Sequence, residues 1–312
     1  MKAIICAKYG SPDVLRLTDV ERPTPRPHEV LIKVYATTVT ASDCIVRGFK
    51  VPVAMWLPMA LAVGFPAPRQ PILGMEFAGE VESVGKEVGA FRKGDRVFGF
   101  DRFGFGCHAE YKRISASGLV APKPVTLSDE DAAAIPFGGL LALSFLRRGR
   151  LQNGQRVLIY GASGSIGSSA VQLAKHFGAA VTGVCSTRNV ERVLSLGADA
   201  VIDYTKEDFV TRGERFDLIL NAVGKAKARL RCERALNPGG KHVTIDDGSP
   251  SVSREDLILL KQLAESGALR PVVDRRYALE EVPEAHRYVE TGHKRGSVII
   301  RVAQVAGHHP FG

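Results

Sequence analysis

The sequence predicts an α/β protein in which a β-barrel-like domain is followed by a doubly wound parallel sheet. Short segments rich in β-branched and aromatic residues, bounded by Gly, Pro or Asp, fill residues 1–125. Strand-like and helix-like runs alternate over residues 126–274. A glycine-rich turn joins the first strand of this second region to its first helix. The 312 residues are enough for two domains, and 45% hydrophobic with 24% charged residues is typical of a globular enzyme.

The expected strands of the first domain are regularly spaced and short. They cover 29–39, 77–85, 95–100 and 109–115. A last apolar run, 297–302, follows the second region and has no helix after it. We therefore expect residues 275–312 to return to the first domain and complete it.

The second domain reads as repeated strand–helix units. The expected strands are 156–160, 180–185, 200–204, 217–223 and 241–245. Helix-like runs separate most of them, at 165–177, 189–197 and 226–236, and another follows at 254–266. Such alternation predicts βαβ units and a parallel sheet.

Charge and cysteine content limit the classes of partner. The net charge is +9, but the Lys and Arg residues are scattered, so we do not expect a nucleic-acid partner. The five cysteines lie far apart, without a C-x-x-C pair. This pattern argues against a disulfide framework or a thiolate zinc site. It favours a reducing compartment, and we expect a cytoplasmic protein.

Residues 51–68 carry no charge but contain Pro52, Pro58, Pro66 and Pro68. A helix that spans a membrane needs about 20 mostly unbroken apolar residues. The segment is therefore expected to be a kinked loop or a short helix, either lining an apolar pocket or packed as a surface flap. No membrane partner is expected.

The turn at Gly161, Gly164 and Gly167 follows an apolar strand and opens a helix. This context gives a glycine pattern its physical meaning as a dinucleotide-binding turn of the Rossmann type. Gly164 lets the backbone approach a pyrophosphate, and Gly167 lets the helix pack closely on the strand. The amides of Ser165 and Ile166 would face the phosphates at the positive end of the helix dipole. A plain tight turn is the alternative.

The end of the second strand indicates which dinucleotide binds. An acidic residue there hydrogen-bonds the ribose of NAD, but this sequence has Ser186, Thr187, Arg188 and Asn189. An arginine and a hydroxyl suit a 2′-phosphate, so NADP(H) is predicted. Arg188 as a solvated residue at a helix start remains an alternative. Tyr204 either contacts the adenosine or packs as a strand-end tyrosine.

The sequence resembles the medium-chain dehydrogenase/reductase superfamily, and within it the zinc-free quinone oxidoreductase group. The motifs that carry the resemblance span nearly the whole chain: MKAIICAKYGSPDVL, RPHEVLIKVYAT, PILGMEFAGEVESVGKEV, FRKGDRVFGF, AAAIPFGGLLAL, GASGSIGSSAVQLAK, LGADAVIDY and GHKRGSVIIRV. The resemblance implies a GroES-like substrate domain, a Rossmann domain and a homodimer. Together with the glycine turn it predicts cofactor contacts at Gly161, Ser163, Gly164, Ser165, Ile166, Gly167, Ser186, Arg188, Tyr204, Asn221 and Val223.

Zinc alcohol dehydrogenases of this superfamily carry Cys and His at the positions of Thr40 and Met75. A threonine hydroxyl and a thioether are not normal Zn²⁺ ligands. The region after Gly99 has only Cys107, whereas the superfamily's structural zinc lobe needs four cysteines. We therefore predict no metal.

Without a Lewis acid, a quinone or an α,β-unsaturated carbonyl is an easier hydride acceptor than a simple ketone. The predicted substrate is a small apolar molecule of this class. Thr40, beside the nicotinamide in the family, and Ser42, at a proton-relay position, are the catalytic candidates. Either Ser42 or Asp43 could instead cap a helix.

Two other functions stay open at this point. The chain could be a zinc-free alcohol dehydrogenase or an enoyl-thioester reductase on the same scaffold. It could also be a non-catalytic NADPH-binding sensor or an RNA-associated protein, which the net charge would favour.

Overall fold

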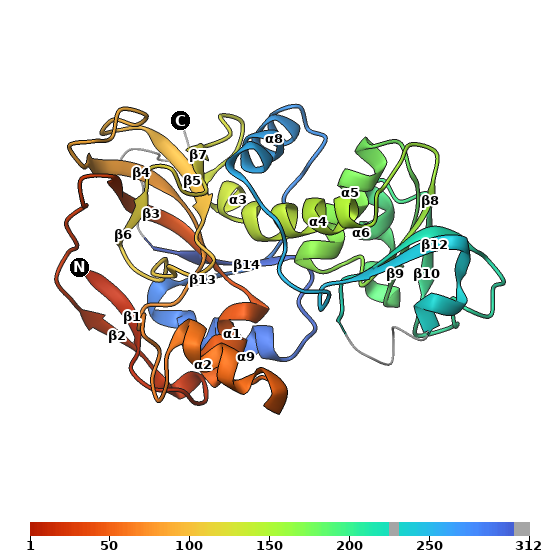
Figure 1. The fold of residues 1–312 in the computed structure, drawn as a ribbon, viewed down its shortest axis with the longest axis horizontal. Coiled ribbons are helices and arrows are strands. Elements are labelled where there is room, and N and C mark those ends of the chain that lie inside the picture. Colours follow the sequence, from red (N-terminus) through yellow and green to blue (C-terminus); the bar gives the residue numbers. More distant parts are fainter. Residues whose placement is uncertain (225–230, 303–312) are drawn as a thin grey trace. The chain divides into compact units, whose positions relative to one another are not determined.

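The computed structural model describes residues 1–224 and 231–302, and it divides into two compact units. Unit 1 contains Met1–Pro136 and the segment from Val273 onward, and unit 2 contains Phe137–Val272 (Figure 1). The sequence placed the first boundary near residue 125. The structure places it later because the short helix α3 (Asp129–Ala133), capped by Ser128, packs against strands of unit 1.

Unit 1 is a β domain with helices at its margin. Its strands are β1 (Lys2–Cys6), β2 (Leu15–Asp19), β3 (Glu29–Val39), β4 (Glu76–Val84), β5 (Arg96–Phe100), β6 (Tyr111–Ser115), β7 (Val120–Pro122), β13 (Val273–Ala278) and β14 (Ser297–Arg301). Its helices besides α3 are α1 (Ala41–Gly48), α2 (Trp56–Val63) and α9 (Val282–Glu290). The β1–β2 hairpin, β13 and α9 were not predicted from the sequence.

Strand β3 is the centre of the unit 1 sheet. The strand order within the described residues is β13-β14-β3-β4-β5-β7, and β6 pairs with the first half of β3. β14 pairs antiparallel with the second half of β3, where Val298 lies opposite Val39. The expected return of the chain's last strand to the first domain is therefore confirmed.

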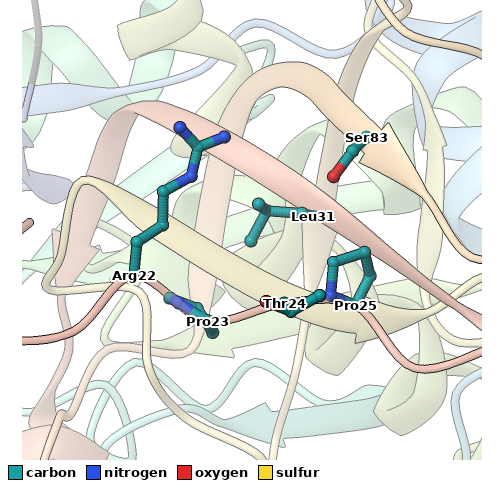
Figure 2. Close-up of a pocket in the computed structure, with 6 residues that line it drawn as sticks. All are labelled: Arg22, Pro23, Thr24, Pro25, Leu31 and Ser83. Carbon is teal, nitrogen blue, oxygen red and sulfur yellow. The ribbon is translucent and has the colours of Figure 1, made fainter.

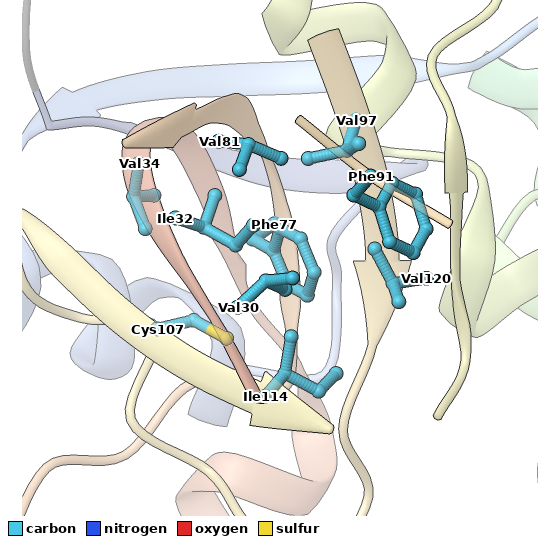
Figure 3. Packing of buried hydrophobic residues seen from close by; sticks show 10 residues of the cluster. All are labelled: Val30, Ile32, Val34, Phe77, Val81, Phe91, Val97, Cys107, Ile114 and Val120. Carbon is cyan, nitrogen blue, oxygen red and sulfur yellow. The ribbon is translucent and has the colours of Figure 1, made fainter. Parts of the chain in front are cut away.

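The core of unit 1 follows from the alternation along β3. Val30, Ile32 and Val34 are fully buried and point to one side, where they meet Phe77 and Val97 from the neighbouring strands (Figure 3). Alternate residues of a strand face the same side of the sheet, so the sequence VLIKV places its first, third and fifth side chains in one layer. This layer fixes the register of the strands that lead into α1.

Unit 2 contains a parallel sheet with helices between some of its strands. Its strands are β8 (Arg156–Tyr160), β9 (Ala180–Cys185), β10 (Ala200–Asp203), β11 (Phe216–Asn221) and β12 (Leu236–Thr244). Its helices include α4 (Pro136–Arg148), α5 (Ser165–His176), α6 (Val190–Ser195) and α8 (Arg254–Glu265). Helices connect β8 to β9 and β9 to β10, whereas β10 and β11 are joined by turns and coil. Part of the helix expected at 226–236 lies outside the described residues.

The strand order of unit 2 is β10-β9-β8-β11-β12, and all of these pairs are parallel. The order runs outward from β8 in both directions, as in a doubly wound sheet. Leu158, Val184 and Ile202 from three neighbouring strands are buried with Phe209 and Phe216 in one cluster. The carboxyl ends of the strands consequently meet along one edge of the sheet.

The uncharged segment 51–68 contains a 3₁₀ turn (Val53–Met55) followed by α2. Leu57 and Leu61 on α2 are exposed by 66% and 68%. Among the described residues, no single helix has the length and composition to cross a bilayer. The pair formed by α1 and Val53–Val63, bent by 85°, passes that test by length and composition only.

A surface hollow of about 220 Å³ lies in unit 1. It is lined by Arg22, Pro23, Thr24, Pro25, Leu31 and Ser83 (Figure 2). The guanidinium of Arg22 is held by Glu82 at 2.9 Å and lies over the ring of Tyr111. The charge in this hollow is therefore already paired, and we assign the hollow no chemical role.

Candidate functional site

The predicted cofactor residues of unit 2 come together at the carboxyl edge of the parallel sheet. Each group follows the end of a different strand: the glycine turn after β8, Ser186 and Arg188 after β9, and Tyr204 after β10. Asn221 ends β11, next to β8. Because the strand order reverses between β8 and β11, this edge includes the switch point where doubly wound sheets bind ligands.

Glycine is required at two positions of the turn. Gly161 has φ = +84°, a conformation that side chains disfavour. A Cβ on Gly167 would collide with the carbonyl oxygen of Gly161 and lie 2.8 Å from Cα of Ala162. Gly164 differs, because a Cβ there would have only the oxygen of Gly161 within 4 Å, at 3.7 Å. The helix thus packs tightly on the strand, as predicted for Gly167, while space remains above Gly164.

The amino end of α5 has no side-chain cap. Gly164 is the N-cap residue, and its carbonyl accepts the amide of Ser168 at 2.8 Å. Ser165 and Ile166 begin the 12-residue helix, so their amides lie at the positive end of its dipole. A diphosphate is the kind of ligand that such a terminus binds.

The loop after β9 is tied to the glycine turn by Asn189. This residue is 4% exposed, and its amide nitrogen lies 3.2 Å from Oγ of Ser163 and 3.1 Å from Oγ of Ser186. Arg188 is exposed on the same loop. The sequence placed Asn189 near the cofactor loop but gave it no role, because its link to Ser163 depends on the three-dimensional pairing of β8 and β9.

A carboxylate near this loop was missed from the sequence. Asp203, at the end of β10, accepts hydrogen bonds from the hydroxyls of Thr187 at 2.5 Å and Thr205 at 2.6 Å. These bonds lower the pKa of Asp203, that from Thr187 most, so the group is ionised. Because both oxygens are engaged by threonine hydroxyls, the carboxylate is not directed at a ribose as the acidic residue of NAD enzymes is.

The turn after β11 reaches the glycine turn. Oδ1 of Asn221 accepts the amides of Val223 at 3.0 Å and Gly224 at 3.2 Å. This folds Val223 back, so that its Cγ2 lies 2.6 Å from the point a Cβ on Gly161 would occupy. In the described part of the chain, Nδ2 of Asn221 and Oδ1 of Asn189 are buried without a hydrogen-bond partner. Buried polar atoms of this kind fit a polar ligand at this edge, such as NADP(H).

The catalytic candidates of unit 1 lie at the amino end of α1. Thr40 is the N-cap residue, and its hydroxyl accepts the amide of Asp43 at 3.3 Å and contacts Oδ2 of Asp43 at 2.6 Å. The same Oδ2 accepts the amide of Thr40 at 2.8 Å, which completes a capping box. The cap is therefore Thr40, not Ser42 or Asp43 as the sequence suggested.

Ser42 has a different environment from Thr40. It is half-buried at the second position of α1, and among the described residues nothing hydrogen-bonds its hydroxyl. The hydrogen of Thr40, in contrast, points to Asp43. The catalytic roles of both residues stay predictions; of the two hydroxyls, only that of Ser42 has no hydrogen-bond partner among the described residues.

A buried polar cluster lies behind α1. Cys44 on α1 lies 3.4 Å from Nδ1 of His286, whose ring packs edge-on against His108. Burial lowers the pKa of His286 well below its ordinary value, and the neighbouring His108 and Arg47 act in the same direction. Burial also raises the pKa of Cys44 to about 12. Both groups are neutral near pH 7, which makes Cys44 a poor nucleophile.

Thr40 and Met75 are the two residues that the family resemblance places at the positions of zinc ligands. Met75 is 3% exposed, and its neighbour Glu76 accepts a hydrogen bond from the hydroxyl of Thr38. Across residues 1–224 and 231–302, no three His, Cys, Asp or Glu side chains form a cluster that could hold a metal ion. All five cysteines are free and buried.

The fold and the residues gathered at this edge of the sheet are those of a two-domain dehydrogenase that binds NADP(H). The sequence matches the alcohol dehydrogenase GroES-like domain over residues 26–125 and the zinc-binding dehydrogenase family over residues 165–285. The chain belongs to the medium-chain dehydrogenase/reductase superfamily, in its quinone oxidoreductase-like group.

Relatives with known names support this assignment. A 2-methylene-furan-3-one reductase of Solanum lycopersicum is 34% identical over 96% of this chain and 79% of its own. The NADPH-dependent alkenal/one oxidoreductase of Arabidopsis thaliana, a chloroplast protein, is 32% identical over 96% of this chain and 79% of its own. The structure of a quinone oxidoreductase from Coxiella burnetii superposes with a TM-score of 0.86 at 30% identity, covering 97% of this chain and 99% of that one.

Proposed function

We propose that this oxidoreductase transfers a hydride from NADPH to a quinone or an α,β-unsaturated carbonyl without a metal ion. The observation that carries the proposal is the pair Thr40 and Met75, neither of which is a zinc-type ligand, in a chain whose predicted cofactor residues lie along one edge of the sheet. The names of the relatives, which include an alkenal/one oxidoreductase and a quinone oxidoreductase, support the same acceptor class.

Different residues of unit 2 would bind different parts of the cofactor. The first turn of α5 would bind the diphosphate, and Ser186 with Arg188 would bind the 2′-phosphate. Tyr204 is 54% exposed and offers a ring face for the adenosine. Bound NADPH supplies the hydride; the protein supplies its position.

A conjugated acceptor fits a site that lacks a Lewis acid. Negative charge that develops on its oxygen is spread over the π system, so hydrogen-bond donors are enough to stabilise it. The hydroxyl of Ser42 is the donor that we propose for this oxygen, because it is half-buried and has no partner among the described residues. Thr40 can donate only by giving up its bond to Asp43.

The test is an acceptor panel with metal control. Oxidation of NADPH is followed with a quinone, an enal, an enone, an enoyl thioester, and a saturated ketone as the reference. The protein is assayed before and after treatment with a chelator, and its metal content is measured. We expect turnover of quinones or enones that the chelator does not change, and little turnover of the saturated ketone.

The other outcomes point elsewhere. Preference for the enoyl thioester or for an alcohol with NADP⁺ would assign the scaffold to those reactions. NADPH binding without turnover of any acceptor, or loss of activity that zinc restores, would contradict the proposal. We also propose a cytoplasmic homodimer, and sedimentation of the purified protein tests the dimer.

A further inference from the structure

We propose that Asn189 is a positioning residue that makes NADP(H), and not NAD(H), the preferred cofactor by turning two serine hydroxyls toward phosphate. The inference deepens the cofactor part of the proposed function and does not depend on the acceptor. It rests on the two contacts of one amide group, its burial, and the exposure of the serines that it holds.

The amide nitrogen of Asn189 has two hydrogens and two partners. Ser163 Oγ lies 3.2 Å away and Ser186 Oγ lies 3.1 Å away, and both geometries are those of hydrogen bonds donated by the amide. Asn189 is 4% exposed, whereas both serines are half-buried. The amide is therefore fixed inside the protein, whereas both serine residues are partly accessible at the carboxyl edge.

A serine hydroxyl has one hydrogen to give and two lone pairs that accept. Because Asn189 occupies a lone pair on each serine, each hydroxyl hydrogen must point elsewhere. Ser163 lies in the glycine turn directly before α5, and Ser186 follows β9. The two hydrogens are thus available to anionic oxygens, one in the turn and one at the 2′ position of the ribose.

The neighbouring threonines show the opposite arrangement. Thr187 and Thr205 give their hydrogens to the carboxylate of Asp203. A hydroxyl used in this way keeps only lone pairs for a ligand, and lone pairs repel a phosphate. The amide of Asn189 donates to its two serines, so their hydroxyl hydrogens remain for a ligand. The carboxylate of Asp203 accepts from its two threonines, so their hydroxyl hydrogens are used within the protein.

Two substitutions at this position test the idea by binding alone. The dissociation constants of 2′,5′-ADP and 5′-AMP are measured by calorimetry for the wild-type chain, N189A and N189D. N189A removes the orientation, so we expect 2′,5′-ADP to bind about tenfold more weakly with 5′-AMP nearly unchanged. N189D takes up both serine hydrogens and adds a charge, so the loss for 2′,5′-ADP should reach about 100-fold.

The matched control is N237A. Asn237 also donates its amide to a side chain, Oδ1 of Asp217 at 2.7 Å, but it lies at the amino end of β12. We expect N237A to leave the ratio of the two dissociation constants unchanged. If N189A does not fold, S186A gives the second test. This single substitution should weaken the binding of 2′,5′-ADP and leave the binding of 5′-AMP nearly unchanged.

Two results from the variants would overturn the proposal, and so would one from the wild type. One is an equal loss of affinity for 2′,5′-ADP and 5′-AMP in N189A and N189D, which is what a purely structural role predicts. The other is an N189D protein that keeps the wild-type preference, which would mean that the amide oxygen faces the serines. A wild-type chain with no preference for 2′,5′-ADP would overturn it together with the cofactor assignment. Failure of the acceptor panel alone leaves this measurement unaffected.

Discussion

The N-cap residues of α1 and α5 both have extended backbone, but a side chain caps the first turn of α1 and none caps the first turn of α5. At α1, Thr40 and Asp43 close the terminus with a reciprocal capping box. At α5, the N-cap is Gly164 and no side chain caps the first turn. Both helices present a positive dipole end. The comparison teaches that the cap residue decides whether that end stabilises the protein or is kept for a ligand.

A third helix supports this interpretation. α8 begins with Ser253 and Asp256, which form the same capping box as Thr40 and Asp43. α2, α6 and α9 also lack a side-chain cap, so what distinguishes the open terminus of α5 is its position at the carboxyl edge that collects the cofactor residues.

The largest loss of NADP⁺ affinity is expected when a side chain is added at Gly167, where the helix packs against the glycine turn. In G167A, the new Cβ meets the carbonyl of Gly161 and the backbone of Ala162, neither of which can yield without moving the turn. We expect NADP⁺ affinity to fall about 100- to 1,000-fold, equivalent to about 3–4 kcal/mol. Stability should fall by about 1–3 kcal/mol. Calorimetry and thermal unfolding measure both.

The control is G89A, because no atom lies within 4 Å of a Cβ at Gly89. G89A should bind NADP⁺ as the wild type does. If G167A bound it equally well, the close approach of α5 to β8 would not matter for the cofactor.

The second effect comes from turning α5 into a capped helix. Gly164 has φ = −79° and ψ = 174°, which aspartate adopts easily, and space is free around its Cβ position. In G164D, the carboxylate should cap the first turn and repel the diphosphate. We expect NADP⁺ affinity to fall about 100-fold, while stability changes by only a few tenths of a kcal/mol, as expected for exchange of Gly and Asp at an N-cap.

The neutral variant G164N separates the cap from the charge. It should lower affinity by about tenfold, since it competes for the amides without adding a charge. Equal effects of G164D and G164N would show that the helix terminus is not the electrostatic site that we describe.

The third effect tests the closed terminus of α1. T40V removes the cap and should cost about 1–2 kcal/mol of unfolding free energy, measured by urea denaturation. T40S keeps the hydroxyl and should restore most of it. S42A removes no hydrogen bond within the described part of the chain, so the free energy of unfolding should change by less than about 0.5 kcal/mol.

S42A should have little effect on stability but a clear effect on turnover. If Ser42 donates to the acceptor oxygen, S42A lowers kcat about 10- to 100-fold without raising the KM for NADPH. A kcat unchanged in S42A would remove Ser42 from the mechanism and leave Thr40 as the remaining candidate.

The smallest effect is the pH dependence of the cluster behind α1. The pKa of His286 lies well below 6.5 in the folded state because of burial, and that of His108 is also lowered, chiefly by burial. The unfolded chain therefore takes up protons below about pH 6.5 that the folded protein does not, so stability is complete above that pH and is lost as the pH falls. Each histidine contributes up to about 1.4 kcal/mol per pH unit.

Urea unfolding between pH 7.5 and 5.5 measures this slope. In H286N, the asparagine can still reach Cys44 but does not titrate, so the slope should become flatter. An unchanged slope would show that other groups control acid stability.

The sequence predicted those parts of the fold that depend on local pattern. The bounds of β3, β8 and β9 agree with expectation because each is a run of β-branched residues between turn residues. The cofactor edge was also predicted, since parallel strands bring their carboxyl ends together. The β1–β2 hairpin was missed: only Leu15 of β2 is buried and Leu17 is 42% exposed, so the apolar residues of this strand do not form one buried face.

The site was predicted less completely than the fold. Asn189 and Asp203 have hydrogen-bond partners in loops that follow other strands, Ser163 after β8 and Thr187 after β9, and sequence spacing contains no information about such contacts. The cap of α1 was assigned to Ser42 or Asp43, although the T-x-x-D spacing of a capping box indicates Thr40. That signal was present in the sequence.

The most direct test of the open and closed termini is amide hydrogen exchange with and without NADP⁺. We predict that saturating NADP⁺ slows exchange of the Ser165 and Ile166 amides, while the first turn of α1 changes much less. Exchange in the first turn of α5 that stays the same at saturation would contradict the account, because the diphosphate would then bind elsewhere.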